Sequence, residues 1–244
     1  MTDQEYEQRL KEEIARVTER YNRIMDTFVI GLASVIDGRD SSTGQHIRRT
    51  SEGVRVFTEI LKKDPEYYLD DMFCVYVTKS APLHDLGKLA IPDSVLCKPG
   101  RFTEEDYARM KMHPQYGARL VYEVLSESPN KDIIRIAINI AHYHHEKWDG
   151  TGYPDGLKGE EIPLEARIMA LVDVFDALVS KRCYKEGYSY DTVFEIIENG
   201  IGTHFDPKLG RKFVGNRKAF EELYDRLLNE EDDGVDLFTR EAGE

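Results

Sequence analysis

The sequence predicts an all-α fold, and two observations carry that prediction. Apolar residues recur at helical spacing in segments separated by turn signals, and little of the chain shows the period-2 alternation of a half-buried strand. Its 244 residues, 41% of them hydrophobic and 32% charged, are typical of a folded globular protein with one domain or two small ones. We expect a helical linker over residues 1–28, the main domain over residues 29–228 and an acidic, flexible tail over residues 229–244.

A long helix is predicted over residues 5–37, because this stretch contains no proline and its apolar residues follow a heptad pattern. The residues of that pattern are Leu10, Ile14, Val17, Tyr21, Ile24 and Phe28. A helix of this size is about 50 Å long, more than the domain needs to cover its core, so its amino-terminal half is expected to project. Two arrangements stay open. The helix either pairs with a second copy in a parallel coiled coil, giving a homodimer or a signal relay, or lies alone on its own domain.

Later helices are indicated by their boundary residues. Thr103 is followed by three acidic residues, which is a helix start of the capping-box type. Residues 191–199 carry apolar side chains at helical spacing and end at Gly200, a residue that favours helix ends. Asp206 and Pro207 have the residue types that open a further helix.

Composition excludes several classes of protein. The formal net charge of −13 argues against broad nucleic-acid binding, which depends on clustered Lys and Arg. No apolar run reaches the roughly 20 residues of a membrane span, and the first 30 residues are charged rather than built as a signal peptide, so we expect a cytoplasmic protein. The three cysteines lack paired spacing and are expected to be reduced thiols.

A set of histidines and one loop motif carry the functional information. Adjacent His84 and Asp85 are followed far downstream by the pair His144-His145 and by a Gly-Tyr-Pro loop at residues 152–154. This combination resembles the HD-GYP family, the cyclic di-GMP phosphodiesterase branch of the HD-domain metal-dependent phosphohydrolases. The resemblance covers roughly residues 30–215. It implies an HD-domain helical bundle behind the long helix, with residues 29–228 as the catalytic domain.

The resemblance also implies two divalent metal ions, with iron or manganese expected from the mixture of imidazole and carboxylate ligands. The implied ligands are His46, His84, Asp85 and Asp173 for one ion, and Asp85, His113, His144 and His145 for the other. Such a pair of ions deprotonates an attacking water and holds phosphate oxygens, which makes the shared carboxylate of Asp85 a catalytic residue. Asp176, three residues after Asp173, is expected to orient a ligand imidazole by accepting its other N–H.

One position departs from part of the family. Some members bind a third metal through a glutamate four residues before the first histidine, and here that position is Ser42. We therefore expect two ions, and with them the linear dinucleotide pGpG as a product more than GMP.

Substrate contacts are implied at four positions. Lys88 lies on the ligand face if the segment is helical, where it would contact the scissile phosphate or protonate the leaving oxygen. Arg182 and Lys185 match positions that hold substrate phosphates, although Cys183 replaces the usual proline between them. Tyr153 either touches the substrate, by stacking on guanine or bonding a phosphate, or belongs to a loop that only supports the histidine pair.

The sequence favours an enzyme because all seven ligand positions are retained. The expected reaction is hydrolysis of cyclic di-GMP to pGpG, GMP or both. Two alternatives stay open: an HD-type phosphohydrolase acting on another cyclic dinucleotide or nucleotide, and a non-catalytic module that binds cyclic di-GMP. Regulation is expected from a receiver, a sensor or a diguanylate cyclase partner.

Overall fold

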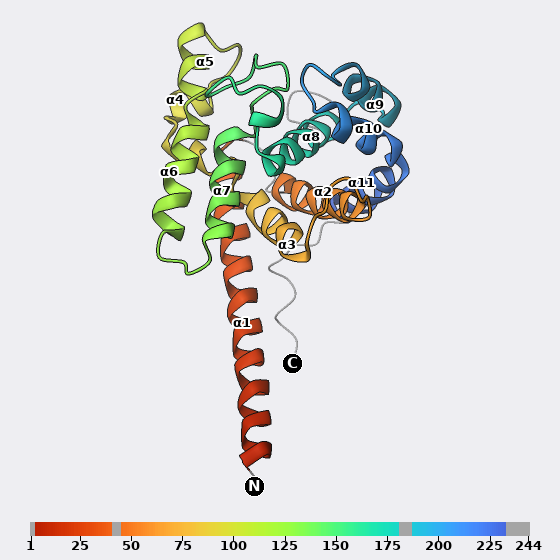
Figure 1. Ribbon diagram of the computed structural model, residues 1–244. Coiled ribbons are helices and arrows are strands. Elements are labelled where there is room, and N and C mark those ends of the chain that lie inside the picture. The colour runs from red at the N-terminus through yellow and green to blue at the C-terminus, as the bar shows by residue number, and fades with distance from the viewer. Residues whose placement is uncertain (1–2, 41–44, 181–186, 233–244) are drawn as a thin grey trace.

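The computed structural model describes residues 3–40, 45–180 and 187–232, and Figure 1 shows them as a cluster of helices with one long helix extending from it. No β-strand occurs within these ranges, so the all-α prediction is confirmed. The first half contains α1 (Asp3–Asp37), α2 (Gln45–Lys62), α3 (Asp71–Ser80), α4 (Asp93–Leu96), α5 (Glu104–Met110) and α6 (His113–Leu125). The second half contains α7 (Lys131–Tyr143), α8 (Leu164–Val179), α9 (Tyr190–Asn199), α10 (Pro207–Gly215) and α11 (Arg217–Asp232).

Short 3-10 helices connect several of these elements. They are η1 (Gly38–Asp40), η2 (Ala81–Leu83), η3 (Leu86–Ala90) and η4 (Gly159–Glu161). Of these, η2 and η3 matter most for the site, because they flank the His84-Asp85 pair.

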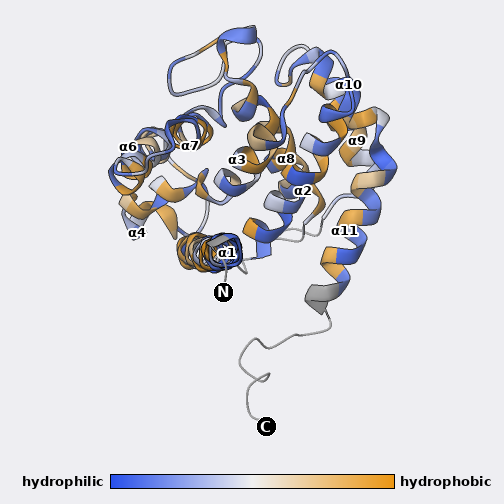
Figure 2. Cartoon of the chain, turned by 60° about the horizontal axis from the view of Figure 1, so that its bottom comes forward, coloured by the Kyte–Doolittle hydropathy of each residue, from blue (hydrophilic) through white to orange (hydrophobic). Residues whose placement is uncertain are grey.

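Two main apolar cores hold the helices together, and a small third cluster consists of Ile91, Val95 and Leu96. The larger one lies among α2, α7, α8 and the three carboxy-terminal helices, and Figure 2 shows orange segments of α2, α8 and α10 facing the middle of the molecule. Its centre is aromatic, with edge-to-face and stacked rings of Phe57, Phe175, Phe213 and Phe220. The smaller core joins the end of α1 to η2, η3, α6 and α7. Side chains from the end of α1 therefore pack in the same core as the segments flanking the His-Asp pair.

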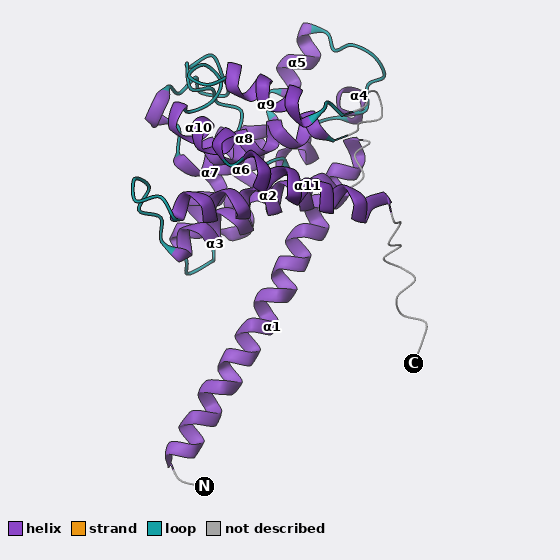
Figure 3. Ribbon diagram, turned by 90° about the vertical axis from the view of Figure 1, so that its right-hand side faces the viewer, coloured by secondary structure: helices purple, strands orange, loops and turns teal. Residues whose placement is uncertain are grey.

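The amino-terminal part of α1 projects from the helical cluster, as Figures 1 and 3 show. Side chains of its heptad pattern are about half exposed, from 49% at Leu10 to 61% at Tyr21. At the other end, Ala33 and Ile36 are buried. The expected projection is confirmed, and the amino-terminal half does not lie on the domain. No described helix combines the length and the apolar character that crossing a bilayer requires.

Boundary residues act largely as their types predicted. The Thr103 side chain and the carboxylate of Asp106 cap each other's backbone at the start of α5, so the capping box is confirmed. Gly200 ends α9, but as the C-cap residue itself with φ of −82°, where any residue is tolerated. The reason for glycine is instead steric, because a Cβ would lie 2.9 Å from the ring of Phe205.

Candidate metal centre

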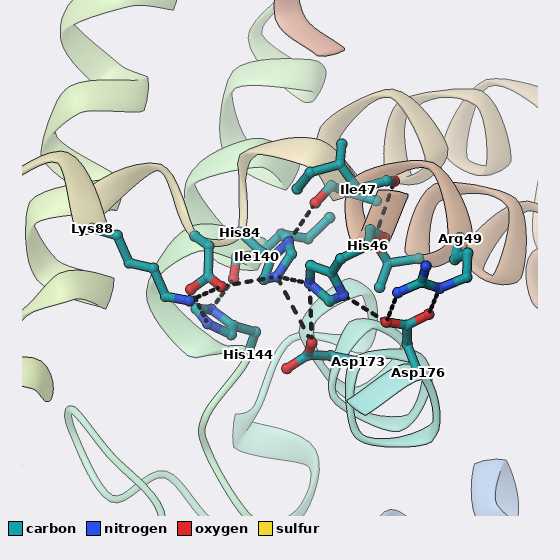
Figure 4. A network of polar contacts seen from close by, with 12 residues as sticks. His46, Ile47, Arg49, His84, Lys88, Ile140, His144, Asp173 and Asp176 are labelled. Atoms are coloured by element: carbon teal, nitrogen blue, oxygen red, sulfur yellow. Dashed lines mark hydrogen bonds and ion pairs between the residues drawn. The ribbon is translucent and has the colours of Figure 1, made fainter. Parts of the chain in front are cut away.

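The predicted ligands come from five parts of the chain and meet between α2, α7 and α8. His46 lies in the first turn of α2, His113 begins α6, and Asp173 lies within α8. His84 and Asp85 lie between η2 and η3, and the His144-His145 pair follows α7. Figure 4 shows part of this convergence, with His46, His84, His144 and Asp173 directed toward one another.

The ligand atoms form two adjacent groups. The Asp85, His113, His144 and His145 ligand atoms all lie within 4.8 Å of one another, and so do those of His46, His84 and Asp173. The two oxygens of Asp85 face different groups: Oδ2 lies 3.4 Å from Nε2 of His84, whereas Oδ1 lies 3.2 Å from Nε2 of His113. Each group could hold a metal ion, and Asp85 lies between the two groups.

Hydrogen bonds to the outer ring nitrogens fix the form of the imidazoles. Nδ1 of His84 lies 2.8 Å from the Ala81 carbonyl, and Nδ1 of His113 lies 2.8 Å from the Met110 carbonyl. Nδ1 of His144 makes the equivalent contact with the carbonyl of Ile140, at 3.0 Å. A carbonyl can only accept, so each Nδ1 carries a proton, and in the neutral imidazole, the form that binds metal, each Nε2 presents a lone pair.

In this neutral form the Nε2 atoms of neighbouring imidazoles face one another with their lone pairs. Nε2 of His113 lies 3.4 Å from Nε2 of His144, and Nε2 of His46 lies 3.3 Å from Nε2 of His84. Two facing lone pairs repel each other unless a cation lies between them. These pairs therefore fit bound metal ions, which take neutral imidazole as a ligand.

Partly buried carboxylates add to the attraction for cations. Burial alone would lower the pKa of His84, but Asp85 and Asp173 outweigh it and raise that pKa to about 9, so a metal ion at Nε2 of His84 would replace a proton. Burial opposes ionisation of Asp85, yet Lys88 and the imidazoles hold its pKa well below the usual range. The charge of the ionised Asp85 favours positive ions in the centre.

Asp176 orients the His46 imidazole. Its Oδ2 lies 2.7 Å from Nδ1 of His46, and its Oδ1 accepts a 2.7 Å hydrogen bond from Nε of Arg49. Burial would raise the pKa of Asp176, but His46 and Arg49 together lower it to about 2. An ionised carboxylate in this place leaves Nε2 of His46 as the ligand atom, which is the role expected for Asp176. Arg49 was not expected from the sequence.

The local structure around His84 and Asp85 differs from the helix assumed in the sequence argument. The chain runs through η2, two turn residues and η3, so the pair does not lie on one α-helix. Lys88 is nevertheless on the ligand side, with Nζ 2.9 Å from Oδ2 of Asp85. Gly87 explains the tight turn, because a Cβ there would lie 1.9 Å from the carbonyl oxygen of His113. Only glycine permits the contact between this segment and α6.

The Gly-Tyr-Pro loop is attached directly to the histidine pair. The ring of Tyr153 stacks on His145 at 4.8 Å between centroids, and Nζ of Lys111 lies 5.3 Å from the Tyr153 centroid. The backbone N–H of Tyr153 donates to the carbonyl of His145 at 3.2 Å. The Tyr153 ring already stacks on His145, a predicted ligand. These contacts therefore favour a role for Tyr153 in supporting the histidine pair over stacking on a base.

Glu146 is a further residue of the site that was not predicted from the sequence. It is buried, and its Oε1 accepts hydrogen bonds from the backbone N–H groups of Asp155 and Gly156, at 2.8 and 2.9 Å. The feature of the sequence that could have identified Glu146 is its position directly after His145. Arg182, Lys185, Cys183 and Ser42, by contrast, lie outside the described residues.

Comparison with known families agrees with this geometry. A sequence-family model described as "HD domain" matches residues 32–209. The chain belongs to the HD-domain family. This match and the relatives described below together confirm the HD-GYP resemblance drawn from the motifs. HD-domain phosphohydrolases are metal-dependent, and the two groups of imidazoles and carboxylates could hold metal.

Several curated relatives resemble this HD-domain chain. It is 45% identical over 197 residues to a cyclic di-GMP phosphodiesterase of Vibrio cholerae, covering 80% of this chain and 40% of the relative. It is 42% identical over 217 residues to the cyclic di-GMP phosphodiesterase response regulator RpfG of Xanthomonas campestris, covering 89% and 53%. A 3'3'-cGAMP-specific phosphodiesterase of Vibrio cholerae is 40% identical over 181 residues, covering 74% and 33%. The chain thus spans about half or less of the length of these proteins.

Solved structures support the fold. The chain resembles a cyclic GMP-AMP phosphodiesterase of Vibrio cholerae (V-cGAP3) with a TM-score of 0.52 at 21% identity, covering 82% of this chain and 53% of that one. It resembles Bd1817 of Bdellovibrio bacteriovorus, described as an HDG"Y"P protein, with the same TM-score and identity, covering 73% and 54%. At this identity the likeness concerns the fold alone.

Proposed function

We propose that this protein is a metal-dependent phosphodiesterase that hydrolyses cyclic di-GMP. The observation that carries the proposal is the pair of adjacent ligand groups that share Asp85, with lone-pair nitrogens facing one another. Relatives named as cyclic di-GMP phosphodiesterases, at 40 to 45% identity, supply the substrate class. The convergence of all seven predicted ligand residues supports catalysis over a module that only binds the dinucleotide.

Two divalent ions would be held by the residues of these groups, with Asp85 serving both ions as the resemblance implies. His46, His84, Asp85 and Asp173 would bind one ion, and Asp85, His113, His144 and His145 the other. The mixed nitrogen and oxygen set suits iron or manganese. When bound, a pair of such ions supplies a nucleophile at neutral pH and neutralises charge on phosphate oxygens.

The chain's own residues complete the reaction. Water forms a bond to phosphorus, the P–O3′ bond breaks, and the leaving 3′ oxygen takes up a proton, which gives pGpG with a 5′-phosphate. Lys88, with its ammonium beside Asp85, would contact the scissile phosphate or donate that proton. Arg182 and Lys185 would hold the remaining phosphate charge. With Ser42 in place of a third-metal glutamate, pGpG is favoured over GMP as the main product.

A second substrate is favoured by a specific observation. Two relatives at 40% and 32% identity are named 3'3'-cGAMP-specific phosphodiesterases. This dinucleotide differs from cyclic di-GMP in one base, so the same phosphate and metal chemistry would act on both. Both dinucleotides are therefore included in the test.

Anaerobic reconstitution tests the proposal. The purified protein is loaded with ferrous iron or manganese, its metal content is measured, and it is incubated with cyclic di-GMP or 3'3'-cGAMP before the products are separated by chromatography. We expect metal-dependent pGpG, and no product from the His84→Ala, Asp85→Ala double variant. Fully loaded protein that leaves both dinucleotides intact would contradict the proposal.

The partners proposed for the chain concern α1. We propose that it forms a homodimer through the half-exposed apolar face and receives a signal from a receiver, a sensor or a diguanylate cyclase. The support is the exposure of that face along the projecting half of the helix.

A further inference from the structure

Arg39 connects the end of α1 to the segment that carries Lys88. It lies in η1, 49 residues before Lys88 in the sequence. Its Nη1 lies 3.4 Å from the carbonyl oxygen of Lys88 and 3.3 Å from that of Leu89. Its Nη2 lies 3.4 Å from the carbonyl of Ile91 and 2.6 Å from Oδ1 of Asp93. One guanidinium thus holds three backbone carbonyls and one carboxylate.

Arginine suits this arrangement because its planar group presents five N–H donors in a fixed fork. A lysine would keep the charge beside Asp93 but could not reach three carbonyls from one rigid plane. Arg39 is itself held in place, since its own carbonyl accepts a contact from Sγ of Cys97 at 3.1 Å, and Ile36, three residues before it, is buried.

Arg39 bonds to the backbone of residues 88–91, and the position of this segment sets the direction of the Lys88 side chain. On the α6 side, Gly87 lies against the backbone of His113 and Gly117, too close for any Cβ. With Arg39 bonded to the carbonyls that follow, η3 is fixed at two places around Lys88. Its ammonium is thereby kept 2.9 Å from Asp85.

We propose that Arg39 is a positioning residue for Lys88: it holds the backbone of residues 88–91 to the end of α1 and so sets the place of the Lys88 ammonium toward a substrate phosphate. The part about substrate rests on the proposed function. Arg39 does not itself touch the ligand groups. Its effect on substrate must therefore pass through Lys88.

A double-mutant cycle tests that dependence without turnover. The probe is the phosphorothioate analogue of cyclic di-GMP, which resists hydrolysis, and its dissociation constant is measured on manganese-loaded protein. Arg39→Ala and Arg39→Lys are each made alone and together with Lys88→Ala. The control is Lys79→Ala, which cuts the Lys79–Asp26 ion pair, a separate contact between α1 and α3.

We expect Arg39→Ala and Arg39→Lys to weaken binding about fivefold when Lys88 is present and less than about twofold in the Lys88→Ala background, because coupled residues are not additive. Lys79→Ala is expected to leave the dissociation constant unchanged. A purely structural role for Arg39 would weaken binding by the same factor in both backgrounds. That result, or no weakening at all, overturns the proposal.

Hydrogen exchange separates this proposal from the proposed function. Arg39→Ala should speed amide exchange in residues 86–93, and Lys79→Ala should not. If the wild type fails to bind the analogue, the substrate assignment fails with the proposed function, and the clamp is judged by exchange alone. Unchanged exchange in Arg39→Ala would overturn the clamp as well.

Discussion

Hydrogen bonds to Nδ1 orient the imidazoles of the predicted metal ligands. Nδ1 of His84, His113 and His144 is bonded to backbone carbonyls, which substitution of a side chain cannot remove. His46 differs, because its Nδ1 depends on the carboxylate of Asp176. The group that holds His46 is therefore the one that mutation can test.

Asp176→Asn should weaken metal binding. The amide keeps the shape of the side chain. It loses the negative charge of the carboxylate, whose two oxygens accept hydrogen bonds from His46 and Arg49. Replacing such partners of ligands typically costs about 10 to 100-fold in metal affinity. Manganese titration by calorimetry measures the change. Asp225→Asn, which alters an exposed carboxylate bonded to Tyr190, is the matched control, and equal affinity in the two variants would contradict the role of Asp176.

His204 gives a pH dependence of stability that is separate from the metal ligands. Burial, with Lys147 adding to it, lowers its pKa from 6.5 to about 4. Because the folded-state pKa lies below the unfolded one, protons bind preferentially to the unfolded chain between these values. This contribution is present above about pH 6.5 and is lost as the pH falls toward 4, for a total of up to about 3 kcal/mol.

Denaturant unfolding of wild type and His204→Gln at several pH values measures this contribution. The difference between the two free energies of unfolding should shift in favour of the variant as the pH falls from 7 to 4. Comparing the two proteins cancels the titration of the other histidines. A difference that is constant with pH would show that His204 keeps an ordinary pKa.

At the scale of elements, close backbone contact decides where the His-Asp pair lies. The segment from η2 to η3 is not an α-helix, and its contact with α6 depends on Gly87. The same contact brings Oδ1 of Asp85 within 3.2 Å of His113. Separating η3 from α6 should therefore loosen the packing between these two elements. It should also disturb the ligand group that contains Asp85 and His113.

Gly87→Ala is expected to lower the free energy of unfolding by about 2 to 3 kcal/mol, the usual upper range for overpacking. It should also weaken manganese binding, because Asp85 and His113 move apart. Gly215→Ala is the control, since a Cβ at that helical position meets nothing within 4 Å. Chemical denaturation and metal titration of both variants test this, and a Gly87→Ala protein as stable as wild type would contradict the close contact.

At the scale of the whole molecule, some features could be predicted from the sequence and others could not. The helical class could be, because capping residues are local signals, and the residues that converge between α2, α7 and α8 were implied by the family resemblance of the motifs around His84 and His144. Arg39 and Arg49 could not be, because their partners lie 49 and 127 residues away and no periodicity links them. Gly200 and Gly87 were visible as glycines, but the contacts that require them arise only in the folded chain.

The projecting half of α1 leaves a property of the whole molecule to be explained. Its heptad side chains are about half exposed although a lone helix in water gains nothing from such a face. Side chains at these spacings pack as knobs into the holes of a second helix. Pairing of two copies would remove this apolar surface from water and join the two domains through their linkers.

Ile14→Glu with Ile24→Glu should therefore convert a dimer into a monomer, because each charge would be buried at the seam without a partner. Sedimentation velocity over a range of protein concentrations measures the change. Arg16 is not part of the heptad pattern and pairs with Glu13 of the same helix, so Arg16→Ala should leave the dimer intact. A wild type that stays monomeric at every concentration would contradict self-pairing and point to a helix from another protein as the partner of this face. Manganese binding should be equal in all of these proteins, since the ligand groups lie beyond the projecting half of α1.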